Sequence, residues 1–343
     1  MRAKGMTYDT GFIRNGEISR ESLEPEVVRR ELAIIRDDLH CNAVQLIGGD
    51  PERLEVASRI AASLGLEVWF SPYPLELGAG EILALFADCA ERAERLREEG
   101  ADVVFVTGVE LSLMNQGFLP GDGVDHRLGL LLSEPDPDSR RERMRVASAR
   151  VNDFLCEAVA VVRERFQGRI TYAAIPFESP DWTLFDIVSV ELIRSAEVAG
   201  HFREGVRTLV GCGKPVAITG FGSAAYRGAG DRGGRAMEIL EYDQQTGAPA
   251  RLNGRYVRDE DEQAGYLREV LEIFDTEGVD SAFVFLFALG NLPHRPDGDP
   301  RYDLDMASPG IVKVLEGRDP GTYPGMAWEP KAAFTAVAEC YRG

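Results

Sequence analysis

The chain has 343 residues, of which 57 are acidic and 38 are lysine or arginine, so its formal net charge is -19. This length suits one (β/α)8 barrel with loop insertions or two modest domains. The strong negative charge disfavours nucleic acids, anionic membranes and polyanionic substrates as partners.

The five cysteines are scattered and never spaced as a metal-binding or redox pair, so we expect reduced thiols. No apolar run approaches the length that spans a bilayer, and the N-terminal residues do not lead into an apolar secretion segment. We therefore expect a cytoplasmic protein that does not contact membranes.

Short strand-like runs alternate with longer amphipathic stretches along the chain. The first strand is expected at 4–8, and the helix that follows, at 25–39, carries Val28, Leu32 and Ile35 on one face. Further strands are expected at 43–47, 66–70, 103–107, 170–174, 187–190, 216–219 and 282–287. Asp50-Pro51 and Asp136-Pro137 mark two helix starts, the second of them leading into a helix that reaches about residue 166.

Eight strands that alternate with helices predict the α/β class and a parallel barrel. We predict one (β/α)8 barrel domain that spans residues 1–343. Two connections after strands depart from the regular pattern: 176–186 is too short for a full helix, and 220–256 is long and rich in Gly and Arg. Loops of the second kind usually wall or cover a site, so we expect a mobile cover over the pocket. Within it, Gly228-x-Gly230-x-x-Gly233 has the letters of a dinucleotide fingerprint, but it follows a loop rather than a strand, which favours the cover.

Glu110 follows the fourth expected strand after Thr107, Gly108 and Val109. A carboxyl at the end of a barrel strand is often partly desolvated, which raises its pKa toward neutrality and lets it donate a proton. The alternative is that Glu110 only pairs with an arginine at the barrel mouth. Its place at a strand end favours catalysis, because barrel enzymes build their sites there.

The run from Lys214 to Gly222 resembles the seventh barrel strand of retaining glycoside hydrolases, which ends in Ile-Thr-Glu-Phe-Gly with the Glu as nucleophile. Gly220 stands where that Glu is expected. The resemblance implies that Glu110 is the general acid/base, although Val109 replaces the Asn usual before it. It also implies that no covalent glycosyl intermediate forms at residue 220.

Four further runs, at 117–121, 226–229, 299–308 and 328–332, resemble a group of actinobacterial barrels labelled "abortive infection protein". This resemblance covers most of the chain, and the Asp-Leu-Asp-Met-Ala-Ser run at 303–308 is its most specific part. The label itself implies no particular chemistry.

A carboxylate that replaces the missing nucleophile must come from another strand end. Glu191 directly follows a buried strand, as Glu110 does, although an ion pair with Arg194 explains Glu191 equally well. We predict that the catalytic residues are Glu110, Glu191 and Glu178. The predicted substrate-binding residues are Asp9, Trp182, Tyr226, Arg227, Asp303 and Asp305.

The resemblance implies an enzyme repurposed from a retaining glycosidase, and specialised-metabolite biosynthesis is the role we expect for it. It would act on a small polar or sugar-like substrate by acid/base chemistry at Glu110, without a glycosyl-enzyme intermediate. Two alternatives stay open: a non-catalytic protein that binds a carbohydrate or another ligand, and a glycosynthase-like Glu-to-Gly variant. We expect no metal and no cofactor, because no zinc, calcium or nucleotide spacing is met. The oligomeric state is not predicted.

Overall fold

In a computed structural model, which describes residues 1–14, 16–133, 135–243 and 245–342, the chain forms a closed barrel of eight parallel strands. The strands that follow one another around the barrel are β1 (Ala3–Asp9), β4 (Ala43–Gly48), β5 (Glu67–Pro72), β6 (Val103–Val109), β7 (Arg169–Ala174), β8 (Val188–Glu191), β9 (Val216–Phe221) and β12 (Ser281–Val284). Parallel pairing of β12 with β1 closes the ring. The predicted class and the (β/α)8 barrel are thus confirmed, and every expected strand is present with ends that differ by at most three residues.

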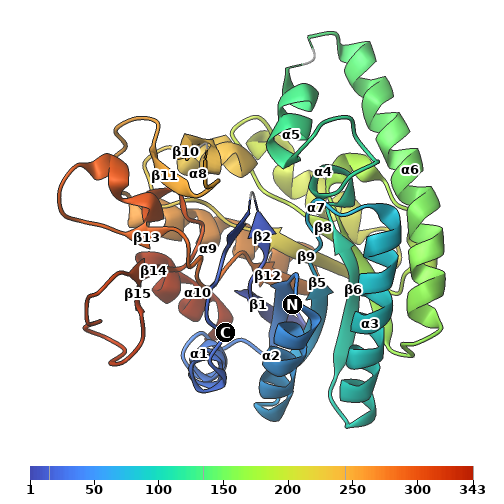
Figure 1. Ribbon diagram of the computed structural model, residues 1–343, viewed down its shortest axis with the longest axis horizontal. Helices are drawn as coiled ribbons and strands as arrows, with labels where there is room; N and C mark the ends of the chain where they lie inside the picture. The colour runs from blue at the N-terminus through green and yellow to red at the C-terminus, as the bar shows by residue number, and fades with distance from the viewer. Residues whose placement is uncertain (15, 134, 244, 343) are drawn as a thin grey trace.

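Helices cover the outside of the barrel. They are α1 (Pro25–Asp37), α2 (Pro51–Ser63), α3 (Ala79–Glu98), α6 (Pro137–Arg163), α7 (Phe202–Val210), α9 (Glu260–Glu277) and α10 (Ala332–Arg342), with the shorter α4 (Leu111–Met114), α5 (Val124–Leu132) and α8 (Ala229–Arg232). In Figure 1, α3 and α6 lie side by side at the right, and α6 extends past the barrel next to α5. Both predicted Asp-Pro helix starts are confirmed, because Asp50 and Asp136 accept backbone hydrogen bonds at the first turns of α2 and α6.

Three small sheets decorate the barrel. They are β2 (Ile13–Arg14) with β3 (Glu17–Ile18), β10 (Leu240–Tyr242) with β11 (Pro249–Leu252), and β13 (Pro293–His294) with β14 (Val312–Leu315) and β15 (Trp328–Pro330). Figure 1 shows the second and third of these sheets on the left of the barrel, with β10 and β11 toward the top.

Side chains fill the barrel interior, because alternate residues of each strand point inward. Trp69 and Phe283 meet there with ring centroids 4.6 Å apart. Gly5 makes room for this pair, since a Cβ at that position would lie 2.3 Å from the Phe283 ring. Val68 and Phe70, on either side of Trp69, point outward and join the apolar layer beneath the helices.

The connection between β7 and β8 contains no α-helix. It has only two short 3-10 turns, η1 (Pro176–Glu178) and η2 (Trp182–Leu184). This confirms the prediction that 176–186 is too short for a full helix. A regular barrel has a helix at this place, so the side of the barrel between α6 and α7 lacks one.

The connection after β9 is folded rather than loose, which corrects the prediction of a weakly restrained cover. It contains α8, a 3-10 helix η4 (Gly233–Ile239) and the β10–β11 hairpin. Ile239 and Leu252 pack with Leu286 and Met306 in an apolar cluster of their own. The Gly228 N–H donates to both carboxylate oxygens of Glu262, at 2.8 and 2.9 Å, so it is not free to hold a phosphate.

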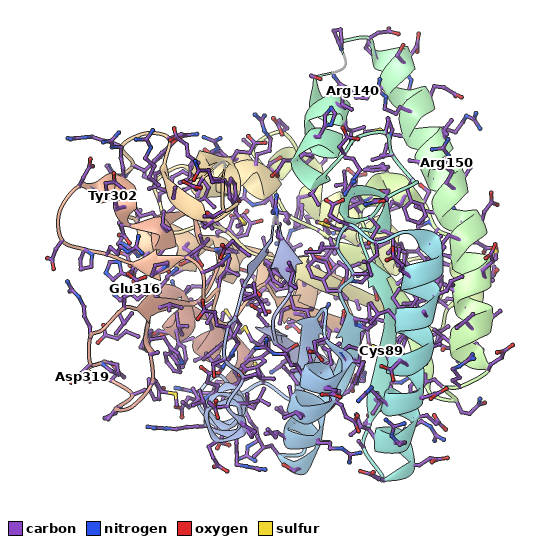
Figure 2. The ribbon with its side chains drawn as sticks, viewed as in Figure 1. Cys89, Arg140, Arg150, Tyr302, Glu316 and Asp319 are labelled. Carbon is purple, nitrogen blue, oxygen red and sulfur yellow. The ribbon has the colours of Figure 1, made fainter. Side chains whose placement is uncertain are left out.

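All five cysteines are free, and Cys89, labelled in Figure 2, is buried on α3. None of the described helices is long and apolar enough to cross a membrane.

Candidate functional site

A cavity of about 1460 Å³ opens at the end of the barrel where the strands finish. Its floor is made by residues at the strand ends, namely Thr7, Gln45, Ile47, Val109, Glu110, Val190, Glu191, Thr219 and Gly220. The folded connection after β9 forms another part of its wall, through Arg235, Met237, Leu240 and Tyr242. This is the end at which barrel enzymes place their active sites.

The backbone just before Glu110 bends so that this side chain enters the cavity. Gly108 has a φ of 89°, and the pairing of β6 with β7 shifts register between Val106 and Val109. Glu110 itself has a φ of 45°, in the left-handed region that side-chain-bearing residues seldom adopt. Its N–H donates to Ala173 O at 2.9 Å, which ties the bend to β7. A strained backbone of this kind is common where a side chain must be aimed at a site.

Glu178, which we predicted to be catalytic, lies behind the cavity wall and holds this bend. Its buried carboxylate accepts hydrogen bonds from Ser112 N at 2.9 Å, Ile175 N at 3.0 Å and the Tyr172 hydroxyl at 2.8 Å. The same Tyr172 oxygen accepts from Leu111 N at 2.9 Å. The two residues after Glu110 are therefore anchored through Glu178, which places Glu178 as a positioning residue.

Glu191 and Gly220 face each other on neighbouring strands. They are register partners at the ends of β8 and β9. A Cβ built on Gly220 would lie 1.6 Å from Glu191 Oε2 and 2.7 Å from its Cδ. The Glu191 carboxylate thus occupies the space that a side chain at residue 220 would need. The ion pair with Arg194, considered from the sequence, is not formed, because Arg194 pairs with Glu269 at 3.2 Å.

The two cavity carboxyls share a poorly solvated site. Burial raises the pKa of Glu110 well above its ordinary value, and the nearby charges of Glu191 and Glu178 raise it further. Burial raises the pKa of Glu191 to about 7, while the Thr219 hydroxyl beside it opposes the shift and the Glu178 charge adds to it. Two carboxyls in such a site do not ionise independently, so the pair retains a proton near neutral pH.

Arg14 and Tyr73 also line the cavity, and sequence reasoning missed both. Arg14 lies on β2 and pairs with Asp125 of α5, while its charge lowers the pKa of Glu110. Burial and the Glu110 charge raise the pKa of Tyr73, so its hydroxyl stays protonated. The sequence offered one usable signal, because Tyr73 directly follows the third barrel strand at the active-site end.

Of the six predicted substrate-binding residues, Trp182 lines the cavity and the other five do not. Asp9 is buried and accepts from Gly11 N at 2.7 Å, and burial raises its pKa to about 6. Tyr226 is buried in the cluster of the folded connection, where its hydroxyl donates to Ala236 O at 3.0 Å. Arg227 is exposed and pairs with Asp259 at 3.2 Å. The structure therefore places these three residues around the site rather than in the lining of the cavity.

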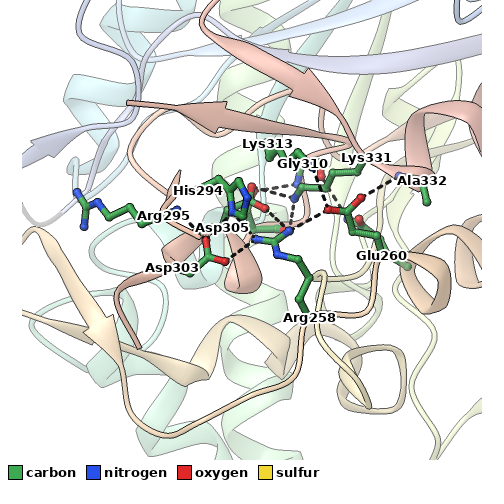
Figure 3. Close-up of polar contacts among 12 residues, drawn as sticks. Arg258, Glu260, His294, Arg295, Asp303, Asp305, Gly310, Lys313, Lys331 and Ala332 are labelled. Atoms are coloured by element: carbon green, nitrogen blue, oxygen red, sulfur yellow. Dashed lines mark hydrogen bonds and ion pairs between the residues drawn. The ribbon is translucent and has the colours of Figure 1, made fainter. Parts of the chain in front are cut away.

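Asp303 and Asp305 are also corrected, since they belong to a buried ion network outside the cavity (Figure 3). Arg258 bridges them with contacts of 2.9 Å to each. Asp305 further pairs with the buried Lys331 at 2.9 Å. Burial alone would raise the pKa of Asp303, but His294 and Arg258 hold it at about 2. The network ties β13, β15 and the segment before α9 together, so its role is structural.

Among the residues that the structure describes, no three His, Cys, Asp or Glu side chains lie together in a way that could hold a metal ion.

No family model and no curated protein matches the chain. Solved structures are similar over its whole length. They include a GH113 β-1,4-mannanase, with a TM-score of 0.62, 14% identity and 99% of both chains covered. A GH113 β-mannanase from Alicyclobacillus acidocaldarius has a TM-score of 0.58 and 14% identity, with 99% of this chain and 97% of that one covered.

A β-glucuronidase from Ruminococcus gnavus is also similar, with a TM-score of 0.55 and 14% identity over 99% of this chain and 49% of that one. At this identity the likeness defines the fold, which is a glycoside-hydrolase-like barrel. The likeness to the "abortive infection protein" group remains a resemblance of sequence.

Removing one partner of the buried network should destabilise the protein without affecting binding. We expect Asp305→Asn to lower the free energy of unfolding by about 3 to 5 kcal/mol, because it leaves buried cations without their partner. Urea denaturation measures this effect, with Asp297→Asn as the exposed control, which should change stability by less than about 0.5 kcal/mol. If the Asp305→Asn variant has normal stability but binds substrate more weakly, Asp305 is a substrate-binding residue as the sequence predicted.

The raised pKa of Glu191 predicts how stability depends on pH. The folded-state pKa of Glu191, about 7, exceeds the ordinary value of 4.5. The contribution of protonated Glu191 to the free energy of unfolding is therefore complete below pH 4.5 and is lost as pH rises to 7. Glu191→Gln should therefore match wild type at pH 4 and be more stable at pH 8, by on the order of 3 kcal/mol. Chemical denaturation at pH 4 and at pH 8 measures this difference in stability, with Glu204→Gln on the surface of α7 as the control. Equal stabilities at pH 8 would mean that the Glu191 carboxylate is well solvated.

Proposed function

We propose that this protein cleaves a glycosidic bond by acid/base catalysis, with Glu110 as the acid and Glu191 as the base. The observation that carries the proposal is the position of the Glu191 carboxylate, within the space of a side chain at residue 220. In glycosidases of this architecture, that strand end supplies the second carboxylate. Glu191 restores one there from the neighbouring strand.

The reaction follows from the protonation states of the pair. Protonated Glu110 gives its proton to the glycosidic oxygen as the carbon–oxygen bond to the leaving group breaks. Ionised Glu191 takes a proton from a water molecule, whose oxygen forms the new bond to the anomeric carbon. Exchange of one proton with solvent then restores the starting state. A base with a pKa of about 7 suits proton abstraction at neutral pH, and no covalent intermediate is required.

The substrate class is proposed from the fold and the cavity together. The similar structures are named as mannanases and glucuronidases, so we propose that a sugar or sugar-like ring lies between Glu110 and Glu191. Arg14 and Tyr73, which line the same cavity, can then donate hydrogen bonds to its oxygens.

The loss of the Glu at residue 220 favours a second candidate, a protein that only binds its ligand. Two poorly solvated carboxyls with raised pKa values lower the stability of the folded protein. A protein that only binds its ligand gains nothing in return, whereas an acid/base enzyme uses them. A glycosynthase-like change of one residue fits less well. A side chain at residue 220 would collide with Glu191 as it stands, so the glycine and Glu191 form a matched pair.

Glu110→Gln should keep the shape of the site and remove its proton donor. We expect kcat to fall by about 10² to 10⁴ while substrate binding is retained. The assay is hydrolysis of a panel of 4-methylumbelliferyl glycosides that includes the β-mannoside and the β-glucuronide. Glu142→Gln, on the exposed surface of α6, is the control. Wild-type turnover by the Gln variant would contradict the role of Glu110, and a trapped glycosyl adduct on Glu191 would make that residue a nucleophile instead.

The contact between Gly220 and Glu191 predicts an unusual pattern of rescue. Gly220→Glu alone should be inactive and less stable, because its Cβ would overlap the Glu191 carboxylate. Combined with Glu191→Ala, it should fold and hydrolyse glycosides with retention through a covalent adduct. Product stereochemistry by proton NMR and intact mass measure this, with Glu191→Ala alone as the inactive control. A single Gly220→Glu variant as stable and active as wild type would show that the two side chains do not compete.

A further inference from the structure

The cavity extends sideways from the two carboxyls into the place of the missing barrel helix. This part, called the side groove below, is lined by Pro180 and Trp182 of the β7–β8 connection and by Phe202, Gly205, Val206 and Leu209 of α7. The groove exists because two 3-10 turns replace the helix between β7 and β8.

The lining of the side groove is apolar. Its six residues carry no charged group, and the only polar side-chain atom among them is the indole nitrogen of Trp182. Charged and ionisable groups lie at its rim instead, at Glu197 and His201. A chain of sugars would require hydrogen-bonding partners along such a surface, whereas hydrocarbon would cover the partly exposed Trp182 and Leu209 at no polar cost.

The walls of the groove are held in place by the surrounding structure. Lys214 Nζ donates to Trp182 O at 2.5 Å and to Phe185 O at 2.6 Å, which fixes the short connection against the start of β9. The Trp182 ring meets Phe185 edge-on with centroids 5.8 Å apart. On the other wall, Phe202 packs against Phe274 of α9 at 6.0 Å. The groove is therefore preformed, as small-molecule sites usually are.

The groove starts at the reacting bond. In the barrel, β7 stands between β6, which carries Glu110, and β8, which carries Glu191. A group leaving the glycosidic oxygen between these carboxyls first meets the end of β7 and the connection that follows it, where Ala174 and Ile175 line the same cavity.

We propose that the side groove binds an apolar aglycone, so that the substrate is an amphiphilic glycoside with its sugar at the carboxyls and its hydrocarbon part along α7. This rests on the proposed function. The groove and the catalytic floor belong to one cavity, which argues for one ligand spanning both rather than for a second copy of the chain.

Gly205 offers a direct test. Gly205 lines the cavity, and a Cβ at this position would have no atom within 4 Å, so Gly205→Trp introduces a bulky side chain at the groove without a clash at its Cβ. Gly265 on α9 is also helical, exposed and open around its Cβ, and it does not line the cavity. Gly265→Trp is therefore the matched control.

The experiment measures binding by calorimetry, on the Glu110→Gln background so that no turnover occurs. The probes are n-octyl β-D-mannoside, methyl β-D-mannoside and n-octanol, all below the micellar concentration. We expect the octyl mannoside to bind at least about 10-fold more tightly than the methyl mannoside, because each buried methylene adds to affinity. Gly205→Trp should abolish this preference, and Gly265→Trp should keep it.

Three results would overturn the proposal: equal affinities of the octyl and methyl compounds, no binding by either octyl compound, or a preference that survives Gly205→Trp. A change of oligomeric state in Gly205→Trp, with no octyl preference in the parent protein, would assign the groove to a second copy instead. The proposed catalytic function is judged separately, because octanol binding in the groove does not depend on turnover and hydrolysis of methylumbelliferyl glycosides does not depend on the octyl preference.

Discussion

The candidate site depends on one steric fact, which is the absence of a side chain at residue 220. Any Cβ there would lie 1.6 Å from Glu191 Oε2, so only glycine admits the carboxylate from the neighbouring strand. The sixth barrel strand, β8, thereby places its terminal carboxylate beside the end of the seventh strand, β9.

The electrostatics of the site follow from this exchange. Glu191 enters a region that already holds Glu110 and the buried carboxylate of Glu178, and burial raises the pKa of all three. Glu178 accepts three hydrogen bonds, and these keep the bend at Glu110 in place. Its negative charge raises the pKa of Glu110 and of Glu191. Arg14 offsets part of this repulsion at Glu110. Because the two cavity carboxyls do not ionise independently, the pair retains a proton near neutral pH.

Two sets of contacts hold the segments that surround the cavity floor. The ion network around Arg258 and the apolar cluster of the connection after β9 hold the surrounding segments without contributing to the cavity floor. The gap between α6 and α7 gives the cavity a second, apolar direction.

The sequence by itself determined the eight strands, the barrel class, the short β7–β8 connection and the strand-end positions of Glu110 and Glu191, because hydrophobic periodicity and capping residues are local signals. Only the tertiary structure decided that Glu191 fills the space at Gly220, since this contact depends on the register between β8 and β9. It also decided that Asp303 and Asp305 face Arg258, because an acidic run reads the same whether it meets a ligand or a partly buried arginine more than 40 residues away in the chain. Glu178 was misread for the same reason: its hydrogen-bond donors come from residues that the fold brings together, not from its spacing in the sequence.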